Sequence, residues 1–469
     1  MKVKLLGSSS KEELENRIQK IAAAGKLSRF DGNVFEVIDS CNDYEKNLKL
    51  IKRIIKMGHK SIIEHDYVVF ALCDVTPIVE QTIIGNRLTS FTIKSRREVD
   101  FRNVDFFVPE FRNKDLTPHK DNQKLQDTYK KHMKILFNTY GEFVDNGINV
   151  EDARFILPYC FYSNIIMGLD CRELEKLTVS LLYGPLSKIA ELKELGNQFL
   201  EIIKTYIPYL VDEIENCTLT NENPFELLEK NSTRPEIEII DKPKLLNYTP
   251  DADNTILKSH IMYHYQCSSI QAVNILNNME KENSNIRKDL MNIITHKEER
   301  RELEQVSYTF QIPISLSILT HLTRHRMHSL LVPEFLPMWN LENYVTPPTI
   351  SASSQLPLFK KMVSENMKIF EEFKKENIAD EDLIYFYLGC QMLNVITTFN
   401  ARTAQWICRL RCCNKAQWQI RNIAKEFAKQ IKEVSPLIGE RLGATCTTDL
   451  VCHEGRECCG LIDKLLNNK

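Results

Sequence analysis

The chain repeats itself at long range. Lys4-Leu5-Leu6 recurs as Lys244-Leu245-Leu246, an offset of 244 − 4 = 240 residues. Farther on, EDARFILPYCFYSNIIMGLDCR from Glu151 aligns with EDLIYFYLGCQMLNVITTFNAR from Glu381, an offset of 381 − 151 = 230. A repeat of this length is a duplicated domain and is too long for one turn of a solenoid. We therefore expect two similar domains in tandem, and duplication alone implies no chemistry.

The repeat sets the expected domain boundaries. The first copy spans residues 1–220 and the second spans residues 241–445. Residues 221–240 are polar and contain proline, which is typical of a linker. A cysteine-rich tail follows over residues 446–469. More than one core is expected in any case for a chain of 469 residues.

Both copies carry helix-start signals at matching places. Thr76 can cap a helix whose first residue is Pro77, and the counterpart in the second copy starts at Ser315. Another helix is expected after Asp43, with Gly58 as its stop signal. β-rich runs stand between such helices. The fold class predicted is α+β, each copy being a small β-sheet flanked by long helices.

Charge and hydropathy exclude several classes of partner. The 61 basic and 63 acidic residues nearly cancel, so no overall field attracts a polyanion such as DNA. The start of the sequence has too short an apolar run for a signal peptide, and no uncharged stretch of about 18 residues could span a bilayer. We expect a cytoplasmic protein without nucleic-acid or membrane partners. Its 14 cysteines are then reduced thiols.

Three linked motifs follow one another in the second copy. They are Arg324-His325-Arg326, Asn400-Ala401-Arg402 and LRCCNKAQWQIR from Leu410 to Arg421. Arg-His-Arg alone is weak, and a helix end whose charges satisfy terminal carbonyls would also explain it. The ordered set resembles the flavin-dependent thymidylate synthases, over both copies and essentially the whole chain.

The resemblance implies a reaction. A flavin-dependent thymidylate synthase converts deoxyuridine monophosphate (dUMP) to thymidylate (dTMP). Methylenetetrahydrofolate supplies the carbon, reduced FAD supplies the hydride, and NADPH reduces the flavin again. No nucleophile from the protein is needed.

The first copy departs from the family pattern in one way and the second copy in another. The first has Gly85-Asn86 in place of Arg-His, but keeps Ser95, Arg97 and Arg154. The second keeps the three motifs, but has Glu334 and Leu336 at the family's serine and arginine. The first copy thus resembles a nucleotide-clasping half-site and the second a flavin half-site.

Active sites of this family are built from several subunits of a homotetramer. The resemblance therefore implies one composite site formed between the two copies, in a homodimer that acts as a pseudo-tetramer.

The resemblance also assigns a role to each retained residue. Ser95, Arg97 and Arg154 would bind the nucleotide, because the planar fork of arginine pairs with phosphate bidentately. Arg411 would bind the substrate and act in catalysis by stabilising charge on the uracil ring. The predicted flavin-binding residues are Arg324, His325, Arg326, Asn400, Arg402 and Ser61.

The tail offers a possible structural zinc site. Cys446, Cys452 and Cys459 are soft ligands within a short polar segment. Their spacing fits no standard zinc finger, and similar cysteine tails occur in this family.

Two other functions stay open. Ile93 and Lys94 are not the residues expected beside dUMP, which leaves room for a flavin enzyme acting on another uracil nucleotide. The other is a catalytically inactive scaffold that binds nucleotide or flavin, which would show binding without turnover.

Overall fold

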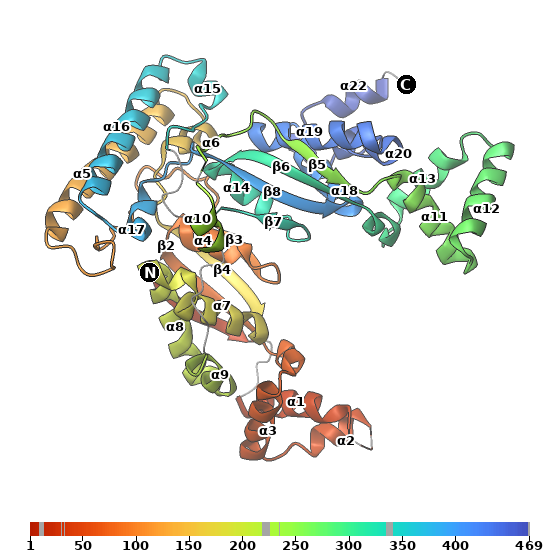
Figure 1. The fold of residues 1–469 in the computed structure, drawn as a ribbon, viewed down its shortest axis with the longest axis horizontal. Coiled ribbons are helices and arrows are strands. Elements are labelled where there is room, and N and C mark those ends of the chain that lie inside the picture. The colour runs from red at the N-terminus through yellow and green to blue at the C-terminus, as the bar shows by residue number, and fades with distance from the viewer. Residues whose placement is uncertain are drawn as a thin grey trace. The chain divides into compact units, whose positions relative to one another are not determined.

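The computed structural model describes residues 1–8, 14–29, 31, 33–217, 226–233, 235–333 and 341–467. The chain divides into two compact units, whose elements are labelled in Figure 1. Unit 1 comprises Met1–Ile237, Phe335–Glu342 and Thr346–Gly389. Unit 2 comprises Glu238–Glu334, Asn343–Val345 and Cys390–Lys469. Glu334 and Leu336, which mark the departures of the second copy, lie outside the described residues.

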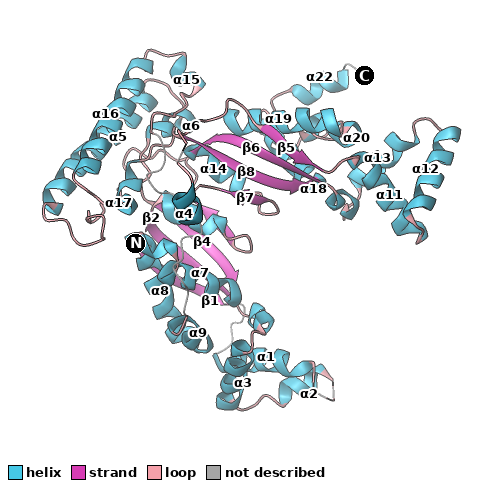
Figure 2. Ribbon diagram, in the orientation of Figure 1, coloured by secondary structure: helices cyan, strands magenta, loops and turns pink. Residues whose placement is uncertain are grey.

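Unit 1 is built on a four-stranded antiparallel sheet with the order β1-β2-β4-β3 (Figure 2). Aromatic and β-branched residues of β2 alternate between buried and half-buried positions, as a strand with one covered face requires. Phe70 of β2 packs on Phe199 of helix α8, with ring centroids 5.1 Å apart. The strands are β1 (Lys2–Ser8), β2 (Tyr67–Val75), β3 (Ser90–Ile93) and β4 (Ser163–Asp170).

Unit 2 repeats this sheet with the order β5-β6-β8-β7, again antiparallel. The repetition extends to detail, because the register shifts between Leu5 and Gly7 in one sheet and between Leu245 and Asn247 in the other. Phe310 packs on Phe427 with ring centroids 4.6 Å apart. The strands are β5 (Lys244–Tyr248), β6 (Ser307–Ser315), β7 (Ser329–Leu331) and β8 (Met392–Asn400). The predicted α+β class and the duplication are confirmed.

Helices surround both sheets. Unit 1 contains α1 (Leu14–Leu27), α2 (Val34–Asp39), α3 (Tyr44–Lys56), α4 (Pro77–Gly85), α5 (Asn122–Asp145), α6 (Val150–Ala153), α7 (Cys171–Tyr183), α8 (Ala190–Tyr206), α9 (Val211–Glu215), α10 (Glu226–Asn231), α15 (Pro348–Ser351), α16 (Leu356–Lys375) and α17 (Asp380–Leu383). Unit 2 contains α11 (Ala252–Tyr265), α12 (Ser269–Glu282), α13 (Ile286–His296), α14 (Leu316–Thr323), α18 (Ala401–Arg411), α19 (Trp418–Val434), α20 (Pro436–Gly439), α21 (Thr445–Thr448) and α22 (Leu461–Asn467).

The predicted helix signals are confirmed. Asp43 accepts a hydrogen bond from the backbone N–H of Lys46 at the start of α3, and Gly58 beyond its end has φ +87°. The Thr76 hydroxyl accepts from the N–H of Ile78 at the start of α4. These local signals depend on neighbouring residues only, which is why the sequence reveals them.

One segment of the second copy is part of unit 1. Residues 346–389 follow the first copy's sequence pattern at an offset near 230, yet they pack into the core that the first copy forms. Helix α16 lies along α5 (Figure 1). A backbone bridge joins Pro158 to Leu388, which are equivalent positions because 388 − 158 = 230. Arg112 binds Asp382 at 2.6 Å. The sequence copies and the compact units therefore divide the chain differently.

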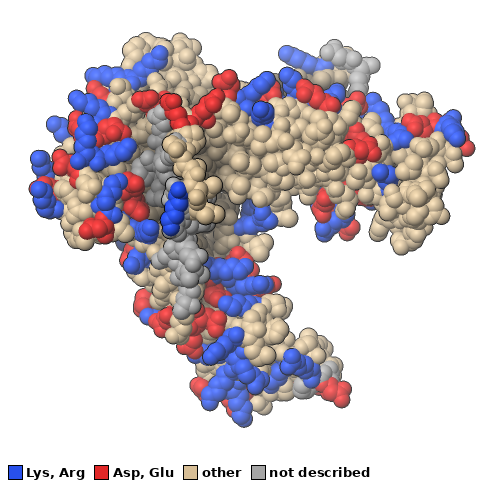
Figure 3. All heavy atoms as spheres, in the orientation of Figure 1, with Lys and Arg blue, Asp and Glu red and all other residues tan. Residues whose placement is uncertain are grey.

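Basic side chains gather on the end of unit 1 formed by α1 to α3 (Figure 3). Helix α3 supplies Lys46, Lys49, Lys52, Arg53 and Lys56. Two of them have carboxylate partners, since Lys46 binds Asp43 at 3.0 Å and Lys52 binds Asp212 at 2.7 Å. Two of these five charges are therefore neutralised, one by the N-cap of α3 and one by a residue of α9. Among the helices that the structure describes, none is both long enough and apolar enough to cross a bilayer.

Candidate active site

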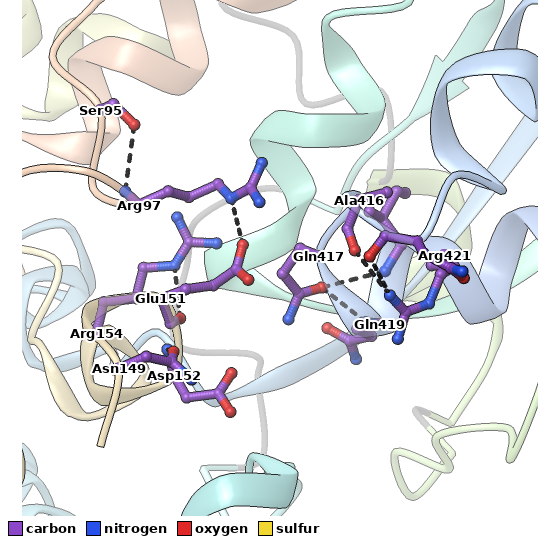
Figure 4. Close-up of polar contacts among 12 residues, drawn as sticks. Ser95, Arg97, Asn149, Glu151, Asp152, Arg154, Ala416, Gln417, Gln419 and Arg421 are labelled. Atoms are coloured by element: carbon purple, nitrogen blue, oxygen red, sulfur yellow. Dashed lines mark hydrogen bonds and ion pairs between the residues drawn. The ribbon is translucent and has the colours of Figure 1, made fainter. Parts of the chain in front are cut away.

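The predicted nucleotide-binding residues of the first copy lie together in unit 1 (Figure 4). The backbone N–H of Arg97 donates to the Ser95 hydroxyl at 3.2 Å. The Arg97 guanidinium forms an ion pair with Glu151. Arg154 Nε donates to the backbone carbonyl of Glu151 at 3.1 Å. The turn from α6 into the 3-10 helix η2 (Arg154–Ile156) thus holds Arg154 beside Arg97.

Positive charge is concentrated at this cluster. Arg154 is 4% exposed, and burial lowers its pKa to about 9. The charges of Arg96 and Arg97 contribute to this lowering of the pKa, while Glu151 opposes it. Three guanidinium groups, those of Arg96, Arg97 and Arg154, face the two carboxylates of Glu80 and Glu151, and the excess positive charge favours an anionic ligand.

Two further residues, Arg96 and Glu80, belong to this cluster and are not apparent from the sequence. Arg96 Nη1 binds Glu80 at 2.8 Å, and both side chains are buried. The Arg96 guanidinium also lies over the ring of Phe161, 5.1 Å from its centroid. Glu80 Oε1 is buried without a hydrogen-bond partner among the described residues. In the sequence, Arg96 is only the middle residue of Ser95-Arg96-Arg97, and no local pattern distinguishes it from a surface arginine.

Arg411, in unit 2, is held by a histidine of the Arg-His-Arg motif. Arg411 Nε donates to His325 Nε2 at 3.0 Å, and Arg411 Nη2 donates to the backbone carbonyl of His321 at 3.3 Å. His325 is 5% exposed, and burial together with the charge of Arg411 lowers its pKa to about 3. A neutral imidazole that accepts at Nε2 carries its proton on Nδ1. His325 therefore orients Arg411, a contact that the sequence did not predict.

The two arginines of this motif have exposed side chains. Arg324 is the C-cap of α14, and Arg326 follows two residues later. Farther on, His328 Nδ1 lies 2.7 Å from the Thr397 hydroxyl of β8. This pair ties the turn after α14 to the sheet.

Asn400 and Arg402 lie where β8 turns into α18. The Asn400 side chain caps the helix, accepting from the N–H of Thr403 at 2.8 Å. Arg402 Nη1 binds Glu304 at 2.6 Å. Ser61 is an exposed residue of the 3-10 helix η1 (Lys60–His65) in unit 1. The other five predicted flavin-binding residues lie in unit 2.

The last motif begins helix α19 (Figure 4). The Gln417 side chain accepts from the N–H groups of Gln419 at 2.7 Å and Ile420 at 3.2 Å. Arg421 Nη1 donates to the backbone carbonyl of Ala416 at 3.2 Å and to that of Asn414 at 2.7 Å. These contacts fix the turn between α18, which carries Arg411, and α19.

The predicted zinc site in the tail is not supported. Cys446, Cys452 and Cys459 are free thiols. Across the part of the chain that the structure describes, no group of three or more His, Cys, Asp or Glu side chains could hold a metal ion. Cys459 instead accepts from the Asn414 amide at 3.5 Å. The tail thus docks on the turn after α18 through individual polar contacts.

The family model described as "Thymidylate synthase complementing protein" matches the chain twice, over residues 12–209 and 244–437. The chain belongs to this family. It carries the family's domain in duplicate, as predicted from the repeat.

Curated relatives agree with this assignment. A flavin-dependent thymidylate synthase from Clostridium tetani is 28% identical over 242 residues, covering 47% of this chain and 93% of the relative. One from Pyrococcus furiosus is 34% identical over 138 residues, covering 29% of this chain and 52% of the relative. The predicted enzyme class, a flavin-dependent methyltransferase, is confirmed at the level of the family.

Among solved structures, the chain is similar to a UMP/dUMP methylase, PolB, from Streptomyces cacaoi bound with 5-Br dUMP. The two are 20% identical, with a TM-score of 0.38, over 45% of this chain and 93% of the other.

Proposed function

We propose that this chain methylates dUMP to dTMP. Methylenetetrahydrofolate is the carbon donor, reduced FAD is the hydride donor, and NADPH is the reductant. The observation that carries the proposal is the gathering of Arg97 and Arg154 with Ser95 around a positively charged locus. A dianionic phosphate matches this charge and this geometry of donors.

In this proposal the nucleotide phosphate replaces Glu151 as the partner of Arg97. The ion pair between Arg97 and Glu151 keeps the guanidinium oriented when no nucleotide is bound. Arg154 is buried and bonded to a backbone carbonyl, so it is fixed before binding. A preorganised site of this kind loses little entropy when the ligand binds.

Arg411 is assigned to the uracil ring. Carbon 5 of uracil becomes nucleophilic when the ring's amide system carries negative charge, and a guanidinium beside that system stabilises the charge. The neutral His325 accepts from Arg411 Nε, and this hydrogen bond holds the guanidinium in one orientation. An imidazolium here would repel Arg411, and the low pKa of His325 keeps the imidazole neutral beside that arginine.

The residues of unit 2 fit a flavin. Arg324, Arg326, Asn400 and Arg402 supply hydrogen-bond donors of the kind that flavin carbonyls and phosphates accept. When bound, a flavin supplies hydride chemistry that no amino-acid side chain offers. The chain's own task is to bind and orient the reactants and to exclude water.

We further propose that one working site takes its phosphate-binding residues from the first copy, and Arg411 and its flavin-binding residues from the second. The split of retained motifs between the copies supports this, because random decay would scatter losses without regard to site membership. The same reasoning suggests a homodimer that acts as a pseudo-tetramer.

Release of tritium from carbon 5 of dUMP tests the function, with flavin, NADPH and methylenetetrahydrofolate supplied anaerobically. We expect flavin- and folate-dependent release together with dTMP. Arg97→Ala and Arg324→Ala should each abolish it, while Lys49→Ala on the basic face of α3 should not. Full activity in either arginine variant would contradict the composite site. Bound flavin without release would favour another uracil nucleotide or a scaffold.

A further inference from the structure

Two equivalent places in the duplicated fold differ in charge. In unit 1 each cation at the start of α7 has a carboxylate partner. Lys60 Nζ lies 2.5 Å from Glu175 and 3.3 Å from Glu213, and Arg172 pairs with Glu64. This place in the first copy is electrostatically balanced.

In unit 2 one of these ion pairs is kept. Arg402 binds Glu304 at 2.6 Å. These two residues are equivalent to Arg172 and Glu64 of the first copy, at offsets of 402 − 172 = 230 and 304 − 64 = 240. The other carboxylates are gone. Along α7 and α18, the replacements at an offset of 230 are Asp170 by Asn400, Glu173 by Thr403, Glu175 by Gln405 and Val179 by Arg409. In the preceding segment Arg300 takes the place of Lys60, since 300 − 60 = 240.

The second copy therefore has three guanidinium groups where the first has balanced pairs. Arg409 Nη2 binds Asp449 at 2.9 Å, and its side chain is 12% exposed. The Nε atoms of Arg300 and Arg409 are buried, and neither has a hydrogen-bond partner among the residues that the structure describes. Burial and the charges of Arg409 and Arg402 lower the pKa of Arg300.

The backbone at Arg300 is also unusual. It lies in the left-handed region with φ +46°, immediately before the 3-10 helix η5 (Arg301–Gln305). A residue other than glycine adopts this conformation only at a cost of about 1 kcal/mol or more. Strained residues of this kind cluster at active sites and ligand-binding sites.

We propose that Arg300, Arg402 and Arg409, the arginine trio, form an anion site that holds the diphosphate of the flavin dinucleotide. The assignment rests on the proposed function. A diphosphate brings negative charge and several acceptor oxygens to a place where the trio and the exposed Arg301 face two carboxylates, Glu304 and Asp449. Arg300 and Arg409 are outside the three sequence motifs, and only the fold brings them to Arg402.

The test is the affinity of the full chain for FAD and for riboflavin, which lacks phosphate, followed by flavin fluorescence. Arg409→Val introduces the residue that the first copy has at this position. Arg300→Ala removes the second guanidinium. Each should raise the Kd for FAD about tenfold or more and leave the Kd for riboflavin unchanged, because each removes a charge-assisted contact to phosphate. The matched control is Lys288→Ala on α13, a cation of the same unit whose side chain is 54% exposed and pairs with Glu440, outside the proposed site.

A variant that is expected to bind FAD more tightly distinguishes a lost contact from misfolding. Asp449→Asn removes the carboxylate that neutralises Arg409, so it should lower the Kd for FAD. Misfolding cannot produce tighter binding. The gain should shrink at high salt, which screens the added attraction.

Three outcomes would overturn the assignment. An unchanged Kd for FAD in both arginine variants would show that no phosphate binds there, and lost discrimination between NADPH and NADH would then assign the trio to the reductant's phosphate. An equal loss for FAD and riboflavin would mean a contact to the ring. A wild-type chain that binds neither flavin would contradict the proposed function itself.

Discussion

A buried carboxyl in unit 1 links the two sequence copies. Glu191 accepts from the Thr76 hydroxyl at 2.6 Å, from the Thr76 N–H at 3.0 Å and from the Tyr385 hydroxyl at 3.1 Å. Burial raises the pKa of Glu191 from 4.5 to about 7, against the effect of these hydrogen bonds. The second copy has Gln419 here, which accepts from the Ser315 hydroxyl at 2.5 Å. An uncharged side chain therefore fits this position.

This carboxyl should make stability depend on pH. Because the folded-state pKa is raised, the contribution of Glu191 is complete below pH 4.5 and is lost as the pH rises through about 7. The loss is about 3 kcal/mol for a shift of this size. Urea unfolding of wild type and Glu191→Gln between pH 5 and 8 measures it. We expect the variant to gain relative stability as pH rises, and parallel curves would contradict the assignment.

His325 has a contact in the structure that its sequence motif does not indicate. Its place in Arg-His-Arg suggested contact with the flavin, and that role stays a prediction. The structure instead shows an imidazole that accepts from Arg411. Two residues separated by 86 positions meet because α14 and α18 both begin at the sheet of unit 2.

At the scale of elements, the pairing of α5 with α16 holds unit 1 together. Asn366 on α16 is fully buried, and its side chain meets His132 of α5 at 2.9 Å and the backbone carbonyl of Phe386 at 2.9 Å. Each of these partners would lose its hydrogen bond if the amide were removed.

Asn366→Ala should therefore destabilise the chain by about 2 to 3 kcal/mol, because it leaves buried polar groups unpaired and opens a small cavity. The denaturation midpoint in urea measures this. Lys361→Ala on the same helix, with a side chain 66% exposed, is the control and should change little. Equal effects of the two substitutions would contradict a specific role for the amide.

At the scale of the whole molecule, the first copy is not independent. Several aromatic contacts join it to the segment 346–389, among them those with ring centroids 5.1 Å apart for Tyr129 and Phe386, 5.0 Å for Phe111 and Phe373, and 6.2 Å for Phe143 and Phe359. A chain cut after residue 220 would expose this apolar surface.

We expect residues 1–220 alone to bind a hydrophobic dye and to aggregate, because they lack the helix that covers α5. Addition of a peptide spanning residues 346–389 should suppress dye binding. Dye fluorescence and size-exclusion chromatography provide the measurement. A monomeric fragment that binds no dye would show that the first copy folds without the second.

Signals within a few residues, or repeated along the chain, were enough to predict much of this protein. The duplication, the α+β class, the helix caps at Asp43 and Thr76 and the family motifs follow from short patterns and their spacing. The sequence also indicated which copy retains which motif. These features depend on backbone preference and hydrophobic periodicity, which are local properties.

Other features required the tertiary structure. The packing of residues 346–389 into the first copy's core depends on side-chain complementarity over more than 200 positions, for which no local pattern exists. The same holds for the pairing of Arg411 with His325 and for the arginine trio. Chain segments far apart in sequence meet through the sheets, and only there do clustered charges and buried donors become visible as sites.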